Sequence, residues 1–323
     1  MNIKSITSIL VAMSLSTIAC AQQINSTLPL EKAQDNLSVG KSLYQSTDWV
    51  DDDTFTQGVE GPAVSPDGIL YAVNFAENGT IGKVVGENKG SVLVNLPNGS
   101  IGNGIRFDAK GNMYIADYIN HNILTISANK LKSDSVNSAD VKVYAHSELM
   151  SQPNDIAIGS DGKLFASDPN WSESNGQLWR IDTDGQVVLL EKDMGTTNGI
   201  EVSPDNKTLY VNESVQRKVW QYQLSADGEI TDKKLLIQFE DYGLDGMRVD
   251  VEGNLYIARY GKGVIAIVSP QGLLLREVQL KGKFPTNVSF GGEEGKKVFV
   301  TLQKRGAIET FYSEFTGRSF SHF

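Results

Sequence analysis

The chain has 323 residues, 40% of them hydrophobic, and carries a formal net charge of −10 with a sequence pI near 4.9. This length and apolar content are enough for a large buried core. The acidic balance, without a basic stripe that could replace counterions, argues against a nucleic acid or an anionic membrane as partner. A small ligand or a cation is the partner that this charge favours. Cys20 is the only cysteine, and cleavage after Ala21 would leave none, which excludes disulfides, thiol catalysis and zinc bound by cysteine.

The first residues have the pattern of an export signal. Residues 1–4 form a short basic region, and residues 6–18 are apolar but too short to span a bilayer, so no transmembrane segment is predicted. Ala19-Cys20-Ala21 fits a small-x-small cleavage site. We therefore expect residues 1–21 to be a signal peptide and the mature chain to be exported and periplasmic. The alternative is a lipoprotein anchored through Cys20.

A β-hairpin pattern repeats through the rest of the chain. In each copy a polar residue leads into an alternating apolar segment, a turn follows, and a second apolar-aromatic segment returns. The aligned apolar residues recur every 43 to 51 residues, a period typical of a β-propeller. Six copies predict an all-β, six-bladed β-propeller over residues 42–323, preceded by a polar linker at 22–41. The copies begin at Glu60, Asn103, Asn154, Asn198, Asp245 and Asn287.

The two ends of the repeat region predict how the ring closes. Residues 42–50 have strand character and precede the first hairpin with nothing of their own to pair with. The last repeat has only one further clear strand, Gly306 to Phe311, and so lacks a fourth. Closed propellers often let an N-terminal strand complete the last blade, which leaves no exposed edge. We expect residues 42–50 to supply this strand.

Each repeat opens with a residue that can offer an oxygen, and the inner strands of a propeller converge on its central channel. The carboxylates of Glu60 and Asp245, with the amides of Asn154 and Asn198, would form a hard oxygen site without His or Cys. Such a site suits a divalent cation, Ca²⁺ before Zn²⁺, Mg²⁺ or Mn²⁺. The cation could polarise a carbonyl oxygen and lower the pKa of a bound water.

The same residue types also have a purely structural interpretation, in which they start strands by bonding nearby backbone. We assign this role to Asn103 and Asn287. None of the three histidines leads a repeat, and His121 lies in a turn after a second strand, which we expect to face away from the axis. The sequence contains no Gly-x-Ser-x-Gly elbow, P-loop or dinucleotide fingerprint.

At these residues the chain resembles the family of gluconolactonase, senescence marker protein (regucalcin) and luciferin-regenerating enzyme, which has diisopropyl-fluorophosphatase and bacterial lactonases as relatives. The resemblance covers about residues 55–312. It implies a six-bladed propeller with one divalent cation held by Glu60, Asn154, Asn198 and Asp245, and Asp245 as nucleophile or as base for the attacking water. The motifs that carry it are Glu60-Gly61-Pro62, Pro153-Asn154-Asp155, Asp168-Pro169, Asn198-Gly199-Ile200, Asp245-Gly246-Met247, and Pro285-Thr286-Asn287 followed by Phe290-Gly291-Gly292 and Val300-Thr301.

The resemblance implies a gluconolactonase-like, metal-dependent hydrolase of the lactone or ester type, with a small-molecule lactone or ester as substrate. Organophosphate hydrolysis would use the same ion. The chain departs from the sugar-lactonase pattern at Gln152, where an arginine is usual, and the loss of that fork of donors argues against a sugar lactone. Further candidate substrate contacts near the channel mouth, each with packing as the alternative role, are Trp171, Met194, Tyr242 and Phe284.

The second hypothesis comes from another functional class. It is a non-catalytic propeller that binds a ligand or a protein and keeps the cation for structural reasons. The two hypotheses differ in their prediction for Asp245→Asn. The enzyme would lose turnover while staying folded, whereas the binding module would keep both fold and binding and have no hydrolysis to lose.

Overall fold

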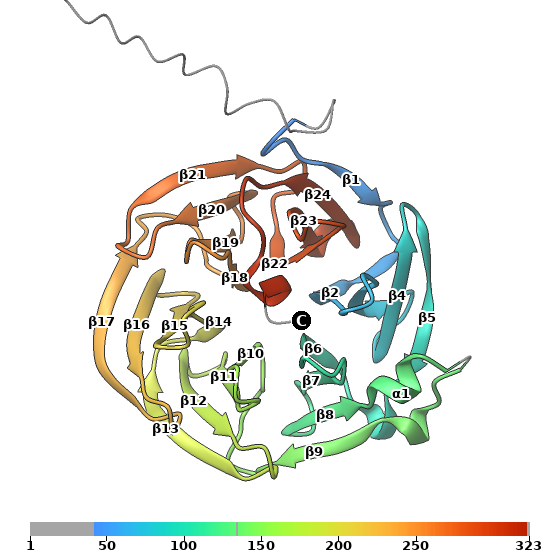
Figure 1. The fold of residues 1–323 in the computed structure, drawn as a ribbon, viewed down its shortest axis with the longest axis horizontal. Coiled ribbons are helices and arrows are strands. Elements are labelled where there is room, and N and C mark those ends of the chain that lie inside the picture. Colours follow the sequence, from blue (N-terminus) through green and yellow to red (C-terminus); the bar gives the residue numbers. More distant parts are fainter. Residues whose placement is uncertain (1–41, 134, 322–323) are drawn as a thin grey trace, which may run out of the picture. The chain divides into compact units, whose positions relative to one another are not determined.

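The computed structural model describes residues 42–133 and 135–321. Six four-stranded antiparallel sheets are arranged around a central axis (Figure 1). This arrangement confirms the predicted six-bladed β-propeller. The predicted signal peptide, lipid-anchor and linker segments, residues 1–41, lie outside the described residues. Within the described ranges, the model contains no helix with the length and apolar character needed to cross a membrane.

Five blades each take four strands that are consecutive in the chain, numbered outward from the axis. The first two blades consist of β2 (Phe55–Val64), β3 (Leu70–Phe75), β4 (Thr80–Gly86) and β5 (Lys89–Asn95), then β6 (Gly102–Phe107), β7 (Met113–Asp117), β8 (Asn122–Ile126) and β9 (Lys142–His146). The third blade consists of β10 (Ile156–Ile158), β11 (Leu164–Asn170), β12 (Asn175–Ile181) and β13 (Val187–Met194). The fourth consists of β14 (Thr197–Val202), β15 (Thr208–Glu213), β16 (Lys218–Leu224) and β17 (Ile230–Gln238). The fifth consists of β18 (Met247–Val249), β19 (Leu255–Arg259), β20 (Val264–Val268) and β21 (Leu274–Gln279).

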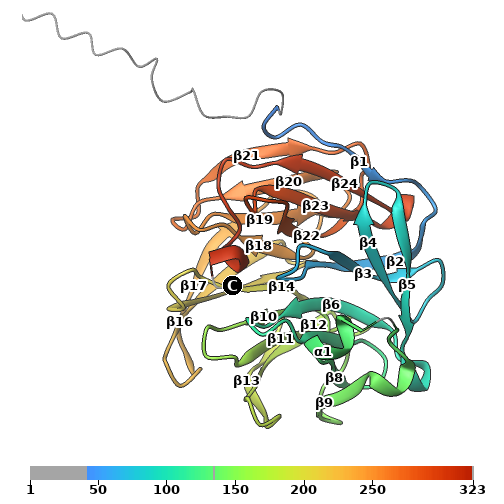
Figure 2. The same ribbon diagram turned by 45° about the vertical axis from the view of Figure 1, so that its right-hand side comes forward.

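The sixth blade joins the two ends of the described chain. Its strands β22 (Pro285–Gly291), β23 (Lys297–Leu302) and β24 (Ala307–Tyr312) are completed on the outside by β1 (Thr47–Val50). The antiparallel register pairs Thr47 with Thr310 and Val50 with Ile308, and both views show β1 beside β24 (Figures 1 and 2). The predicted ring closure by an N-terminal strand is therefore confirmed.

The hydrophobic core lies mainly between neighbouring blades. Val73 and Ile81 of the first blade pack with Ile105, Ile115 and Leu124 of the second in one buried cluster. Burial decreases with distance from the axis. In the fourth blade, each residue of the inner strand β14 is buried, whereas the outer strand β17 is mostly exposed or half-buried. Apolar packing thus fixes the inner strands, and with them the side chains that face the channel.

Glycine after the leading polar residue lets the inner strands approach one another. A Cβ placed on Gly246 would lie 1.9 Å from Cγ of Asn287, and one on Gly199 would lie 2.6 Å from the backbone oxygen of Asp245. Neither position has room for a side chain. The recurring Asn-Gly and Asp-Gly pairs are therefore a packing requirement of the crowded axis.

The helical segments are short. In the sequence, α1 (Ala128–Leu131) precedes the polar insertion at 132–140, which makes one repeat longer than the others, and η2 (Ser138–Asp140) ends it. The remaining 3₁₀ turns are η1 (Pro97–Gly99), η3 (Gln303–Arg305) and η4 (Arg318–Ser321). In Figure 1, η4 lies over the middle of the ring.

Candidate metal centre

The predicted oxygen residues meet at one mouth of the channel. Glu60, Asn154, Asn198 and Asp245 line a single pocket of about 450 Å³, although they come from four different blades. Glu60, Asn154 and Asn198 are buried, with 6%, 5% and 2% of their surface exposed, and Asp245 is half-buried. Convergence of the inner strands thus brings together side chains that are up to 185 positions apart in the sequence.

Three oxygens of this set have no partner. Within residues 42–133 and 135–321, Oε1 of Glu60 and the Oδ1 atoms of Asn154 and Asn198 are buried and accept no hydrogen bond. A buried acceptor without a donor costs about 1–3 kcal/mol, so three in one pocket need an explanation. Oxygen-only acceptors of this kind are the ligands that hard divalent cations prefer. The residues present therefore fit such a cation.

The ring contains few of the commonest metal-binding side chains. Within the described ranges, no three His, Cys, Asp or Glu side chains are grouped to hold a metal ion. The ring has only two carboxylates, and its other oxygens are carboxamides. Such a donor set excludes the thiolate and imidazole chemistry of common zinc sites and resembles the oxygen shells of calcium sites.

The electrostatics of the two carboxyl groups, Glu60 and Asp245, also fit a bound cation. Burial, together with the charge of Asp155, raises the pKa of Glu60 to about 7. Burial and the charge of Glu60 raise the pKa of Asp245 well above its usual range, against an opposing hydrogen bond from the side chain of Asn198. Burial is the main cause of both pKa shifts, and repulsion from a neighbouring negative charge adds to each. A divalent cation would relieve this repulsion.

Asn103 and Asn287 hold their neighbours in place. Asn103 donates from Nδ2 to the backbone oxygen of Asn154 at 3.1 Å, as expected for a residue that bonds nearby backbone. Asn287 instead donates from Nδ2 to Oε2 of Glu60 at 3.1 Å. This bond occupies one oxygen of the Glu60 carboxylate and leaves Oε1 for the pocket. Asn287 is therefore a positioning residue of the ring rather than only the start of a strand.

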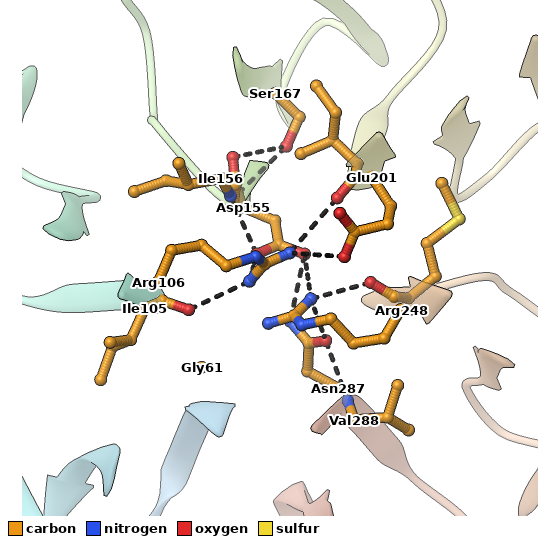
Figure 3. Close-up of polar contacts among 12 residues, drawn as sticks. Gly61, Ile105, Arg106, Asp155, Ile156, Ser167, Glu201, Arg248, Asn287 and Val288 are labelled. Carbon is orange, nitrogen blue, oxygen red and sulfur yellow. Dashed lines mark hydrogen bonds and ion pairs between the residues drawn. The ribbon is translucent and has the colours of Figure 1, made fainter. Parts of the chain in front are cut away.

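Figure 3 shows a buried ionic cluster, which contacts the ring through Asn287. Asp155 Oδ1 lies 3.1 Å from Nη1 of Arg106, and its Oδ2 lies 3.2 Å from Nη1 of Arg248. The same Nη1 of Arg248 donates to Oδ1 of Asn287 at 3.1 Å. The two guanidinium groups hold the pKa of Asp155 below its usual value despite its complete burial. Because Nδ2 of Asn287 also lies 3.3 Å from Oδ2 of Asp155, Asp155 supports the ring through Asn287.

The predicted substrate contacts lie in different environments. Trp171, with 37% of its surface exposed, lines the pocket. Met194 is buried in the core and accepts a hydrogen bond from Tyr222, and Phe284 packs edge-on against Tyr260. Tyr242 is exposed and Gln152 half-buried, but neither is among the residues that line the pocket.

Sequence reasoning missed several residues of the pocket wall. Tyr118, Tyr260 and Gln303 line the pocket together with Trp171, and all four follow the second strand of their blade. We expected turns at this position to face away from the axis, and they instead surround the channel mouth. The hairpin geometry predicts this position, since the second strand returns to the end of the blade where the first strand, with its leading oxygen residue, begins. His121 follows a second strand too, but it does not line the pocket.

The residues of the ionic cluster also occupy recurring positions in the sequence repeats. Arg106, Glu201 and Arg248 each stand three residues after the leading residue of their repeat, and Asp155 stands one residue after Asn154. Aligning the repeats at this position would have revealed charged residues in segments that are otherwise apolar. Such charges are rare in buried strands unless they are paired.

Fold and pocket together define a six-bladed β-propeller with an oxygen-lined pocket at one mouth of its channel. The chain belongs to the SMP-30/Gluconolactonase/LRE-like family, whose model matches residues 59–304. This match confirms the resemblance noted from the repeat motifs.

Individual proteins support this membership. The chain is similar to a 6-deoxy-6-sulfogluconolactonase of Pseudomonas putida, with 30% identity over 47% of this chain and 54% of the relative. It is also similar to a gluconolactonase of Zymomonas mobilis, with 27% identity over 62% of this chain and 60% of the relative. These curated relatives are thus matched over little more than half of their length.

A solved structure supports the fold. The crystal structure of a calcium-binding protein, regucalcin, from Agrobacterium tumefaciens superimposes with a TM-score of 0.72 at 20% identity. The superposition covers 86% of this chain and 97% of that protein. At this identity the likeness establishes the shared propeller fold.

Proposed function

We propose that this protein is a metal-dependent hydrolase of lactones or related esters. A divalent cation, Ca²⁺ before Zn²⁺, Mg²⁺ or Mn²⁺, would be held by Glu60, Asn154, Asn198 and Asp245. The observation that carries the proposal is the convergence of three unpartnered buried oxygens and a fourth, partly exposed carboxyl group on one pocket. When bound, the cation would supply a Lewis acid for a carbonyl oxygen.

Asp245 is the residue that we assign to the chemistry. It is the ring member with a partly exposed side chain, so a substrate in the pocket can reach it. Its raised pKa makes its carboxylate a stronger base than an ordinary aspartate. In one role it takes a proton from water while the water oxygen attacks the carbonyl carbon, and the proton then passes to the ring oxygen that leaves. In the other role Asp245 attacks the carbonyl carbon itself, the bond from that carbon to the ring oxygen breaks, and the ring oxygen takes a proton from water. The hydroxide that remains then hydrolyses the resulting anhydride and restores the carboxylate of Asp245.

The pocket wall favours a compact polar substrate with an apolar face. Trp171, Tyr118 and Tyr260 supply aromatic surface, while Asn78 and Gln303 supply hydrogen-bonding groups. Two relatives named for gluconolactones support sugar lactones as the first class to test. The absence of an arginine at Gln152 weighs less than the sequence suggested, because this residue does not line the pocket.

The proposal is tested by following the hydrolysis of a panel of sugar lactones, aliphatic lactones and aryl esters by the purified chain. We expect turnover to disappear on chelation and to return when Ca²⁺ is added. Asp245→Asn should lower kcat by about 10²- to 10⁴-fold while leaving the chain folded. Asp227→Asn, the same substitution at an exposed turn, should leave turnover unchanged.

A result against the proposal would be the absence of turnover on every member of the panel, with cation bound and the propeller folded. That result would favour the binding module with a structural cation. Activity that survives both chelation and Asp245→Asn would show that the protein is a hydrolase but that its active site is not the one assigned here.

We also propose that the protein is exported, on the basis of residues 1–21 alone. Mass spectrometry of the mature chain should show an N-terminus after Ala21, and the protein should fractionate with the periplasm. A lipid-modified Cys20 in the membrane fraction would support the lipoprotein alternative instead.

A further inference from the structure

Five large apolar side chains of the described ranges are exposed on turns and connections at the mouth of the oxygen-lined pocket. Their exposed fractions range from 37% to 74%, and they are Ile119, Leu149, Trp171, Val215 and Tyr242. Three of them follow the second strands of the second, third and fourth blades by one or two residues. Leu149 and Tyr242 lie in connections from an outer strand to the inner strand of the next blade. Both kinds of segment adjoin the mouth, because the inner strands begin there.

Hydrogen bonds tie these segments together over the second and third blades. The amide of Ser147 donates to the backbone oxygen of His121 at 3.3 Å, which joins the connection that carries Leu149 to the turn that carries Ile119. The backbone oxygen of Leu149 accepts from Nε2 of Gln177 at 2.7 Å. Gln177 belongs to β12, which begins directly after the turn of the third blade. These segments are therefore continuous from Ile119 to the third blade.

The series continues through the fourth blade. Nε2 of Gln216 donates to the backbone oxygen of Ser174 at 3.3 Å, which joins the turns of the fourth and third blades. The amide of Leu244 donates to the backbone oxygen of Ser214, also at 3.3 Å, and joins the connection that carries Tyr242 to the same turn. The five apolar side chains thus lie along one hydrogen-bonded arc over blades that are neighbours in Figure 1. We call them the apolar arc.

The apolar arc is continuous with the oxygen-lined pocket. Trp171 belongs to both, and Tyr118 and Ser214, which directly precede Ile119 and Val215, line the pocket as well. Single exposed apolar side chains are ordinary on a protein surface, whereas several that adjoin one pocket are typical of a ligand contact. A molecule whose reacting group lies in the pocket can therefore extend an apolar substituent over the arc.

The opposite side of the mouth is polar. The turns of the first and sixth blades carry the exposed side chains of Glu77, Asn78 and Lys304. Beside them, Arg305 pairs with Asp52 at 2.6 Å, in the connection that leads into the first blade. An apolar substituent would meet charged groups on this side and apolar surface on the other. The hydrophobic effect therefore directs it to the apolar arc.

The charges beside the apolar arc indicate an uncharged substituent. Glu148, Glu173 and Glu240 are exposed, each within two residues of a member of the arc. Arg217, at the end of the turn of the fourth blade, is half-buried. The chain as a whole carries a net charge of −10. A carboxylate or phosphate on the substituent would therefore be repelled.

We propose that the apolar arc determines substrate specificity and selects lactones or esters that carry an uncharged apolar substituent. The compact polar head, the lactone ring or ester group, lies in the oxygen-lined pocket, and the substituent packs on Leu149, Trp171 and Val215. Within the substrate panel, lactones with an alkyl chain should then exceed sugar lactones. The inference rests on the proposed hydrolase function for the reaction, whereas binding of the substituent can be measured by itself.

The test compares γ-butyrolactone, which has no substituent, with γ-nonalactone, which carries a pentyl chain, on the full, Ca²⁺-loaded protein. We expect kcat/KM to be about 10- to 100-fold higher for γ-nonalactone, the effect of removing about half of the chain from water. Leu149→Ser/Val215→Ser should lower this ratio about three- to tenfold. Val85→Ser/Leu273→Ser, the matched change at exposed positions away from the mouth, should keep it. All four side chains are exposed, so both variants should unfold near the wild-type temperature.

The outcomes separate the arc from the hydrolase. Equal kcat/KM for the two lactones, or a ratio that Leu149→Ser/Val215→Ser leaves unchanged, would overturn the inference and keep the hydrolase. Turnover of neither lactone would remove the proposed function, and calorimetric titration with γ-nonalactone then tests the arc alone. Binding that the double substitution weakens at least threefold supports the arc, and absent or unchanged binding overturns it.

Two further results address other occupants of the arc. A wild-type dimer that dissociates in Leu149→Ser/Val215→Ser, measured by analytical ultracentrifugation, would assign the arc to a second copy of the chain and overturn the inference. A γ-lactone whose pentyl chain ends in a carboxylate should lose the advantage over γ-butyrolactone. Equal kcat/KM for this compound and γ-nonalactone would overturn the uncharged class.

Discussion

Asn287 donates a hydrogen bond from Nδ2 to Oε2 of Glu60 at 3.1 Å, although the two residues are 227 positions apart in the chain. The contact joins the inner strands of the last and first blades where they meet at the axis. It fixes one oxygen of the Glu60 carboxylate, so that the other faces the pocket without a partner. The closure of the ring and the geometry of the candidate metal centre therefore depend on the same bond.

Asn287→Ala should weaken Ca²⁺ binding about 10- to 100-fold, the usual effect of losing a residue that orients a metal ligand. Isothermal titration calorimetry on the metal-stripped chain measures this directly. Asn254→Ala is the matched control, because Asn254 is also buried and donates to a carboxylate, that of Asp250 at 2.9 Å, but lies outside the pocket. Equal Ca²⁺ affinity in both variants would contradict the positioning role of Asn287.

The stability of the metal-free protein should decrease between about pH 4.5 and pH 7. The pKa of Glu60 is raised from 4.5 to about 7 in the folded chain, so the folded state binds more protons than the unfolded state within this window. Its contribution to the free energy of unfolding is therefore fully present at low pH, falls as the pH rises to about 7, and then levels off.

Thermal unfolding of the chelated protein at a series of pH values measures this effect. Glu60→Gln should unfold at a less pH-dependent temperature than the wild type, and Ca²⁺ should restore the wild-type protein at neutral pH. Glu87→Gln, at an exposed position, should follow the wild type. Identical pH profiles for wild type and Glu60→Gln would show that this carboxyl group has an ordinary pKa.

Asp155→Asn should cost about 3–5 kcal/mol of unfolding free energy, because it leaves two buried guanidinium groups without their shared counter-charge. Urea unfolding provides the measurement. The same substitution at Asp67, whose pair with Lys132 at 3.6 Å is exposed, should cost at most about 1 kcal/mol. Similar losses in both variants would mean that the cluster does not stabilise the channel.

Val50→Asp should destabilise the ring at its closure. Val50 is 1% exposed in β1 and packs in the core between the first and last blades, so a carboxylate there would be buried without a partner. We expect a loss of at least about 3 kcal/mol, or aggregation through the freed edge of β24. Val85→Asp, in β4 with 64% exposure, should change stability by no more than about 0.5 kcal/mol. A mild effect at Val50 would contradict closure by β1.

The sequence was most informative where a feature repeats. The recurrence of a leading oxygen residue, often followed by glycine, predicted the blades, the channel and the meeting of Glu60, Asn154, Asn198 and Asp245. These features follow from symmetry, since equivalent positions must converge on one axis. The strand between residues 42 and 50 was predictable because the last repeat was one strand short.

Features that break the symmetry were harder to predict. Asn287 occupies the same repeat position as Asn154, yet it turns its amide toward Glu60, and only the side-chain packing at the axis decides between the two orientations. Met194 ends the outer strand β13 and is buried in the core, whereas Trp171 follows β11 and lines the pocket. Where each strand ends and how the next turn runs determine this difference, and no periodic pattern encodes it.

X-ray diffraction from crystals soaked in Mn²⁺, which gives an anomalous signal, tests the central claim most directly. We expect one strong anomalous peak in the channel mouth, within about 2.0–2.6 Å of oxygens of Glu60, Asn154, Asn198 and Asp245. The peak should be absent in Glu60→Gln/Asp245→Asn crystals. A fully occupied site elsewhere on the propeller, with the four oxygens bonded only to water, would contradict the account.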